Sequence, residues 1–155
     1  MSFQIAGLPV ETFRPLFGLS DEALAERGVI RRTADAKPGF PCRITLRDAE
    51  PGDTLLLLNH ESHSVATPYR SAYAIYVNEA ATETRHEIDA VPEVLRHRPL
   101  ALRIFNAEGM LIGADLTPGE MLEGAIAQAF ANPEAAYIHA HNAAHGCFAA
   151  RIERA

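Results

Sequence analysis

Two apolar runs joined by a four-residue turn constrain the fold of this chain more than any other feature. Residues 100–105 and 110–116 flank the turn Asn106-Ala-Glu-Gly109. Asparagine at the first turn position and glycine at the fourth favour a tight turn between antiparallel strands. The resulting register pairs Asn106 with Met110. It also brings together two apolar cross-strand pairs, Phe105 with Leu111 and Ile104 with Ile112.

Shorter patterns extend this hairpin to a larger sheet. Residues 3–8 and 71–77 have the composition of strands, and Cys42, Ile44 and Leu46 alternate with polar residues up to position 47. The continuous apolar run at 54–58 is typical of a central strand, and we expect residues 59–63 to form the loop after it. We therefore predict one α+β domain spanning residues 1–155, with a mostly antiparallel sheet of about six to eight strands and two to four helices packed on it.

The best helix signal follows the hairpin, at residues 118–131. Thr117 is a natural N-cap, Pro118 suits the first helical position, and Glu120 completes a capping box. The apolar stripe predicted for this helix consists of Met121, Leu122, Ala125, Ile126, Ala129 and Phe130. Its other face carries few charges around Gln128, which makes it a candidate homodimer contact.

Composition excludes several classes of protein. The chain has 155 residues and a net charge of −6, and no basic cluster large enough to bind nucleic acid. It has no apolar run long enough to span a membrane and no visible signal peptide, so we expect a cytoplasmic protein. Its two cysteines, Cys42 and Cys147, are expected to be free thiols. Alternation places Cys42 in the core.

The residues with the most reactive side chains are concentrated near the end of the chain. His139, His141, His145 and Cys147 fall within nine positions, and imidazole and thiol groups bind metals, carry protons and act as nucleophiles. Pairing His141 with Cys147 sends all apolar residues of a hairpin to one face, whereas pairing Asn142 with Cys147 mixes the two faces. The first register predicts a Cys147–His141 pair as catalytic candidates, and a metal site for which His139, His141 and Cys147 are candidates, with zinc as the fitting ion.

Other polar residues suit a small anionic ligand. Arg70 with Tyr69 precedes one predicted strand, Arg43 lies on the polar face of another, and Asn142 follows His141. A guanidinium binds carboxylate or phosphate in a fork. We therefore predict Arg70, Tyr69, Arg43 and Asn142 as ligand-binding residues.

Three groups of segments resemble a bacterial family catalogued as domain of unknown function 1203. They are residues 34–43 with 48–52 and 57–59, residues 67–70 with 74–75, and residues 141–142 with 146–148 and 151–152. The resemblance extends from about Phe3 to Arg154 and implies one small bacterial domain, with no activity or catalytic residue to transfer. It gives more weight to Cys42, Arg43, Tyr69, Arg70, His141, Asn142 and Cys147 than to His139 and His145, which argues against a four-ligand metal site.

Three interpretations stay open from the sequence. The first is an enzyme or binding protein with a Cys/His/Arg pocket for a small anionic molecule. The second is a transition-metal-binding protein that uses the histidine cluster. The third is a non-catalytic homodimeric module in which the hairpin residues are structural. The sequence requires no cofactor and does not decide whether the protein is an enzyme.

Overall fold

Four helices and eleven strands make up the computed structural model, which describes residues 1–155. The predicted α+β class is confirmed, but the strands form two sheets rather than one. The helices are α1 (Val10–Phe13), α2 (Asp21–Ala25), α3 (Glu93–Arg96) and α4 (Leu122–Phe130). Short 3₁₀ turns follow α1, at Arg14–Leu16, and precede α4, at Gly119–Met121. No helix has the length and apolar composition needed to cross a membrane.

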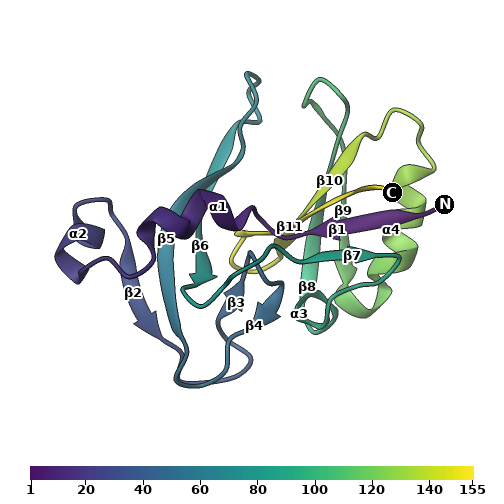
Figure 1. Ribbon diagram of the computed structural model, residues 1–155. Coiled ribbons are helices and arrows are strands. Elements are labelled where there is room, and N and C mark those ends of the chain that lie inside the picture. The colour runs from purple at the N-terminus through teal and green to yellow at the C-terminus, as the bar shows by residue number, and fades with distance from the viewer.

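The larger sheet has six antiparallel strands in the order β7-β1-β11-β10-β8-β9. Figure 1 shows it on the right, with α4 on its outer side. Along the chain these strands are β1 (Phe3–Ala6), β7 (His86–Ile88), β8 (Pro99–Phe105), β9 (Leu111–Pro118), β10 (Tyr137–Asn142) and β11 (Phe148–Arg154).

The smaller sheet has five strands in the order β2-β5-β6-β3-β4 and occupies the left of Figure 1. It is mixed because β3 runs parallel to β6, whereas the other neighbours are antiparallel. Its strands are β2 (Ile30–Thr33), β3 (Pro41–Cys42), β4 (Arg47–Asp48), β5 (Thr54–His63) and β6 (Ser71–Asn78). The apolar run at 54–58 begins β5, which has neighbours on both sides, as the sequence predicted.

Each sheet has its own hydrophobic core. Leu122, Ile126 and Phe130 of α4 pack against the six-stranded sheet, whereas Phe13 of α1 and Leu24 of α2 pack with residues of β5 and β6. Phe148 of β11 belongs to this second core, although its strand lies in the larger sheet. The C-terminal hairpin therefore lies where the two cores meet.

The strand predicted for residues 42–47 is replaced by a turn between two very short strands. Leu46 N–H donates to the carbonyl of Cys42 at 3.0 Å, and Leu46 has a positive φ of 52°. The alternating residues are all buried, but so is Arg43, at 3% exposure. The prediction that Arg43 lies on a polar strand face is therefore wrong, because the turn redirects its side chain inward.

The start of the main helix was also predicted incorrectly. Strand β9 continues through Thr117 to Pro118, and no side chain caps α4. The backbone at Gly119 passes close to Leu95. Only glycine fits there, because a Cβ at this position would overlap the Leu95 carbonyl oxygen. Leu122, Ile126 and Phe130 are buried as predicted, whereas Met121 is 62% exposed.

The predicted hairpin at 100–116 exists, with one irregularity. Phe105 pairs with Leu111 as expected, but Ile104 pairs with Gly113 because a bulge shifts the register by one residue. A second irregularity affects the segment predicted as a loop. Residues 59–63 continue β5, and the β5–β6 ladder shifts between His60 and His63.

Candidate functional site

The C-terminal hairpin contains a bulge that changes which residues face one another. Asn142 N–H donates to the Cys147 carbonyl at 2.9 Å, and His141 pairs with Phe148. The ladder then pairs Ala140 with Ala150, so Ala149 is an extra residue. The predicted pairing of His141 with Cys147 is wrong. The alternative pairing forms instead, because the bulge returns the apolar residues after it to the core face.

This register separates the predicted Cys147–His141 pair. Neighbouring residues of a strand point to opposite faces, so Cys147, opposite Asn142, projects away from the His141 side. His141 Nδ1 lies 2.8 Å from the Gly146 carbonyl oxygen, and its ring packs edge-on against Tyr73 at 4.9 Å. Burial lowers the pKa of His141, and the Gly146 contact opposes this shift. No hydrogen bond joins His141 to the thiol.

Arg43 takes the place beside Cys147 that the sequence assigned to histidine. Its guanidinium donates three hydrogen bonds: Nε to the Phe148 carbonyl at 2.8 Å, one terminal nitrogen to the Pro41 carbonyl at 2.6 Å, and the other to Cys147 Sγ at 3.1 Å. The turn after β3 directs Arg43 inward, and the bulged start of β11 presents the thiol and the Phe148 carbonyl. Arg43 therefore links the two sheets through main-chain and sulfur acceptors.

The charge of Arg43 has no carboxylate counter-ion. The guanidinium forms no salt bridge, and its three acceptors are two carbonyls and the sulfur. Burial lowers the pKa of Arg43, and the neighbouring Cys147 opposes that shift. A buried cation normally needs a paired anion, and the sulfur of Cys147 is the hydrogen-bonded group that can become one.

Asn142 completes this cluster, which we call the Arg43–Cys147 site, consisting of Arg43, Asn142 and Cys147. The Asn142 side-chain amide donates to Sγ at 3.5 Å. Its Oδ1 atom is buried and has no hydrogen-bond partner. Two N–H donors therefore point at one half-buried sulfur.

The other two predicted ligand residues lie elsewhere, in the connection between β5 and β6. The Tyr69 carbonyl oxygen lies 2.9 Å from Nδ1 of His63, and Arg70 Nε donates to the Val65 carbonyl at 3.1 Å. The Arg70 side chain is 55% exposed and lies 3.6 Å from Glu61. The structure thus brings Arg43 and Asn142 together but does not place Tyr69 or Arg70 beside them.

The predicted metal ligands are also not assembled. The structure contains no group of three or more His, Cys, Asp or Glu side chains that could hold a metal ion. His145 lies in an exposed loop, and His139 points to the side opposite Cys147. The metal interpretation of His139, His141 and Cys147 therefore receives no geometric support.

The two cysteines have different environments and form no disulfide. Cys42 is buried in the core as predicted, and its sulfur accepts from the Asn78 N–H at 3.2 Å. Cys147 is only half-buried. Small reagents in solution can therefore reach Cys147 more readily than Cys42.

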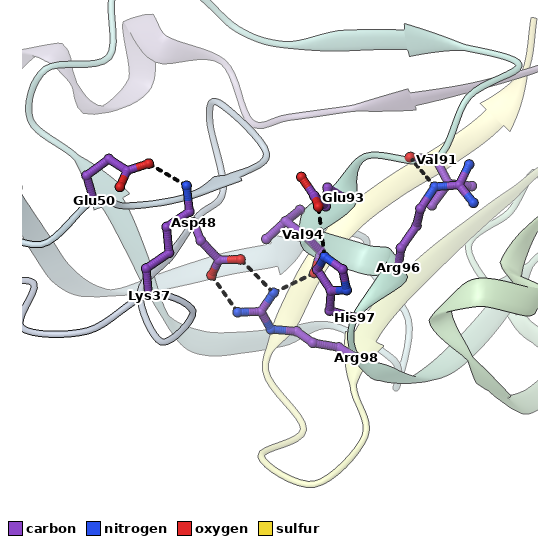
Figure 2. Close-up of polar contacts among 9 residues, drawn as sticks. All are labelled: Lys37, Asp48, Glu50, Val91, Glu93, Val94, Arg96, His97 and Arg98. Carbon is purple, nitrogen blue, oxygen red and sulfur yellow. Dashed lines mark hydrogen bonds and ion pairs between the residues drawn. The ribbon is translucent and has the colours of Figure 1, made fainter.

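A cleft of about 950 Å³ lies between the β3–β4 region and α3, and its charged groups mostly pair with one another. Figure 2 shows Arg98 holding both oxygens of Asp48, at 2.6 and 3.1 Å, with Lys37 on Glu50 and His97 on Glu93 nearby. These pairs leave no unpartnered buried group in the cleft. We therefore place the candidate site at the hairpin.

Comparison with known proteins adds a family but no activity. A model of the family described as "Protein of unknown function (DUF1203)" matches residues 39–154, which include all three residues of the Arg43–Cys147 site. No curated protein and no solved structure matches the chain.

Proposed function

The chain belongs to the DUF1203 family, whose function is unknown, and we propose that it acts through a reactive cysteine, Cys147, whose thiolate is the counter-ion of Arg43. One observation carries the proposal. A guanidinium that is 3% exposed, with no carboxylate partner, donates to a half-buried sulfur at 3.1 Å.

The physical reason is the free energy of a buried charge. An unpaired charge in a protein interior is strongly unfavourable. A thiolate beside the guanidinium removes that penalty, and the Asn142 amide adds a second donor to the same sulfur. Positive charge and N–H donors near a cysteine increase its thiolate fraction, and the thiolate is the nucleophilic form.

The chemistry this supports is attack by sulfur on a small electrophile. With hydrogen peroxide, the thiolate forms an S–O bond while the O–O bond breaks. The departing hydroxide takes up a proton and becomes water. Cysteine is oxidised to sulfenic acid and the peroxide is reduced.

The direct test is the rate of alkylation by iodoacetamide near neutral pH, followed by mass spectrometry of each cysteine. We expect Cys147 to react faster than a cysteine in an unfolded peptide, because its thiolate is stabilised. Asn142→Asp, which places a negative charge beside the sulfur, should slow the reaction about tenfold. Asn59→Asp, at an exposed position of β5, is the matched control for added charge and should react like the wild type.

Cys42 serves as an internal reference, because it is buried at 2% exposure and should be labelled only on unfolding. The proposal is wrong if native Cys147 reacts no faster than the peptide cysteine, or if Asn142→Asp leaves its rate unchanged. In that case Arg43 serves only to bind the carbonyls of Pro41 and Phe148.

A bound anion is a second candidate counter-ion, because Arg43 lacks a carboxylate partner. Phosphate distinguishes the two. If an anion occupies the site, phosphate should raise the melting temperature of the wild type more than that of Asn142→Asp and should slow alkylation of Cys147. If the thiolate is the counter-ion, phosphate should change neither quantity.

A further inference from the structure

A cavity of about 670 Å³ lies beside the hairpin face that carries His139, Phe148 and Arg151. Its other walls come from the segment between β1 and α1, from the segment before β7, and from Ser62 near the end of β5. Cys147 does not line it. A cavity of this volume is in the range that binds small organic molecules.

Ser62 lines this cavity, and its hydroxyl group makes no hydrogen bond within the protein. The irregularity in the β5–β6 ladder between His60 and His63 leaves Ser62 without a partner residue in β6. Its Oγ atom is buried and has no hydrogen-bond partner. In contrast, Oγ of exposed Ser64 donates to Glu61 at 2.9 Å.

His139 supplies a second unused polar group at the same cavity. The side chain is 2% exposed, lines the cavity, and makes no hydrogen bond through either ring nitrogen. Burial, with the nearby charge of Arg151, lowers the pKa of His139 to about 2. The imidazole is therefore neutral at physiological pH and offers one donor and one acceptor.

A buried polar atom without a partner, such as Ser62 Oγ beside this cavity, is unusual in a folded protein. A buried group without a hydrogen bond destabilises the fold, so nearly all such groups have partners. The volume is far greater than the roughly 30 Å³ occupied by one water molecule. This combination is typical of a site whose partner is a ligand.

We infer that this cavity binds a small organic molecule with an uncharged hydrogen-bonding head, such as an amide, carbonyl or hydroxyl, held by His139 and Ser62. Leu8, Val10 and Phe148 provide an apolar wall for the body of the ligand. Arg151 does not call for an anionic head, because its Nε already donates to Glu153 at 2.7 Å. Glu11 and Glu83 in the lining repel anions further.

Four probes that share an aromatic ring test the head group: benzamide, benzyl alcohol, benzoate and benzylamine. We expect benzamide and benzyl alcohol to bind saturably and to shift the NMR signals of the His139 ring, and benzoate to bind at least tenfold more weakly. Ser62→Ala and His139→Phe should each weaken benzamide binding about tenfold, the usual effect of losing one hydrogen bond to a ligand. Ser64→Ala is the matched control and should bind benzamide like the wild type.

Stability gives an independent readout. Ser62→Ala removes a buried hydroxyl with no partner, so its melting temperature without probe should equal or exceed that of the wild type. A lower melting temperature would show that the hydroxyl already has a partner, such as ordered water, and would overturn the inference. The inference also fails if neither benzamide nor benzyl alcohol binds saturably, if benzoate or benzylamine binds as tightly as benzamide, or if benzamide binds both cavity variants as it binds the wild type.

Discussion

At the scale of single residues, the molecule depends on side chains held by groups other than their usual partners. Arg43 is bound by carbonyls and a sulfur instead of a carboxylate, and His139 is buried with no hydrogen bond. A hydrogen bond to a charged group contributes about 1.5–3 kcal/mol, which is why Arg43 can remain inside. Each arrangement leaves one group available for reaction or binding: the thiol beside Arg43 and the imidazole of His139.

His139 makes the stability of the protein depend on pH. Its pKa is about 2 in the folded state and 6.5 as the ordinary value, so protonation favours the unfolded chain. The free energy of unfolding should be highest above the ordinary value. It should fall as the pH is lowered through 6.5 toward 2, by up to about 1.4 kcal/mol per pH unit for this one group.

Urea unfolding at several values between neutral and mildly acidic pH measures this slope. His139→Phe should flatten it, because the variant has one fewer group to protonate on unfolding. Its matched control is His145→Gln, in an exposed loop. An unchanged slope in His139→Phe would contradict the assignment. His60 and His141, whose pKa values burial also lowers, should account for the dependence that remains.

At the scale of elements, the irregularities in strand pairing place the residues of the two proposed sites. Bulges interrupt the β5–β6, β8–β9 and β10–β11 pairs. The first leaves Ser62 unpaired, and the last places Cys147 opposite Asn142. Apolar patterning predicted the strands 71–77 and 100–105 well, because one face of each is buried. It could not predict an extra residue, because a bulge is selected by contacts across the sheet.

Glycine-to-alanine substitutions test how closely the backbone segments pack against one another. At Gly7 an added Cβ would overlap the Ile44 carbonyl oxygen, whereas at Gly124 in α4 no atom lies within 4 Å of it. Gly7→Ala should destabilise the protein by about 3 kcal/mol or more, because the backbone next to Arg43 must move. Gly124→Ala should instead stabilise it by about 0.5–1 kcal/mol, because alanine favours a helix over glycine.

Thermal unfolding of the two variants measures this contrast. Gly7→Ala should also slow alkylation of Cys147, since Arg43 directly precedes Ile44. Equal stability of the two variants would show that the contact between the β1–α1 segment and Ile44 is looser than described.

At the scale of the whole molecule, polar side chains link the two sheets, in addition to the apolar contact of Phe148 with the core of the smaller sheet. Arg43 of the smaller-sheet region binds the Phe148 carbonyl of β11, and Arg98, just before β8, holds Asp48 of β4. The Asp48 side chain is 8% exposed and that of Arg98 18%. Figure 2 shows this second link.

The Arg98–Asp48 pair should contribute to cooperative unfolding of both sheets. Asp48→Asn should lower the free energy of unfolding by about 3 kcal/mol, because it leaves a largely buried guanidinium without its anion. A double-mutant cycle with Arg98→Met should give a coupling energy of about 1–3 kcal/mol. The exposed pair Arg96 and Glu123, with side chains 42% and 54% exposed, is the matched comparison and should give less than about 1 kcal/mol.

The division into two sheets could not be predicted from the sequence. Composition and alternation indicate strands, and they correctly gave the α+β class, but they do not say which strands share a sheet. Cys147 was singled out from the sequence as a candidate, because a cysteine within nine positions of three histidines stands out. Its partner was predicted incorrectly, because 104 residues separate Arg43 from Cys147 and only the folded arrangement of the sheets brings them together.

Phe148 belongs to both proposed sites. The residue lines the cavity, and its carbonyl oxygen accepts the Nε hydrogen bond of Arg43. A ligand that moves this residue would therefore change how Arg43 meets the sulfur. Thermodynamic linkage is reciprocal. If the ligand changes the equilibrium for ionisation or oxidation of the thiol by some factor, then that ionisation or oxidation changes the affinity of the cavity for the ligand by the same factor. One peptide unit would make the two sites a coupled system, in which occupancy on one face of β11 sets the chemistry on the other.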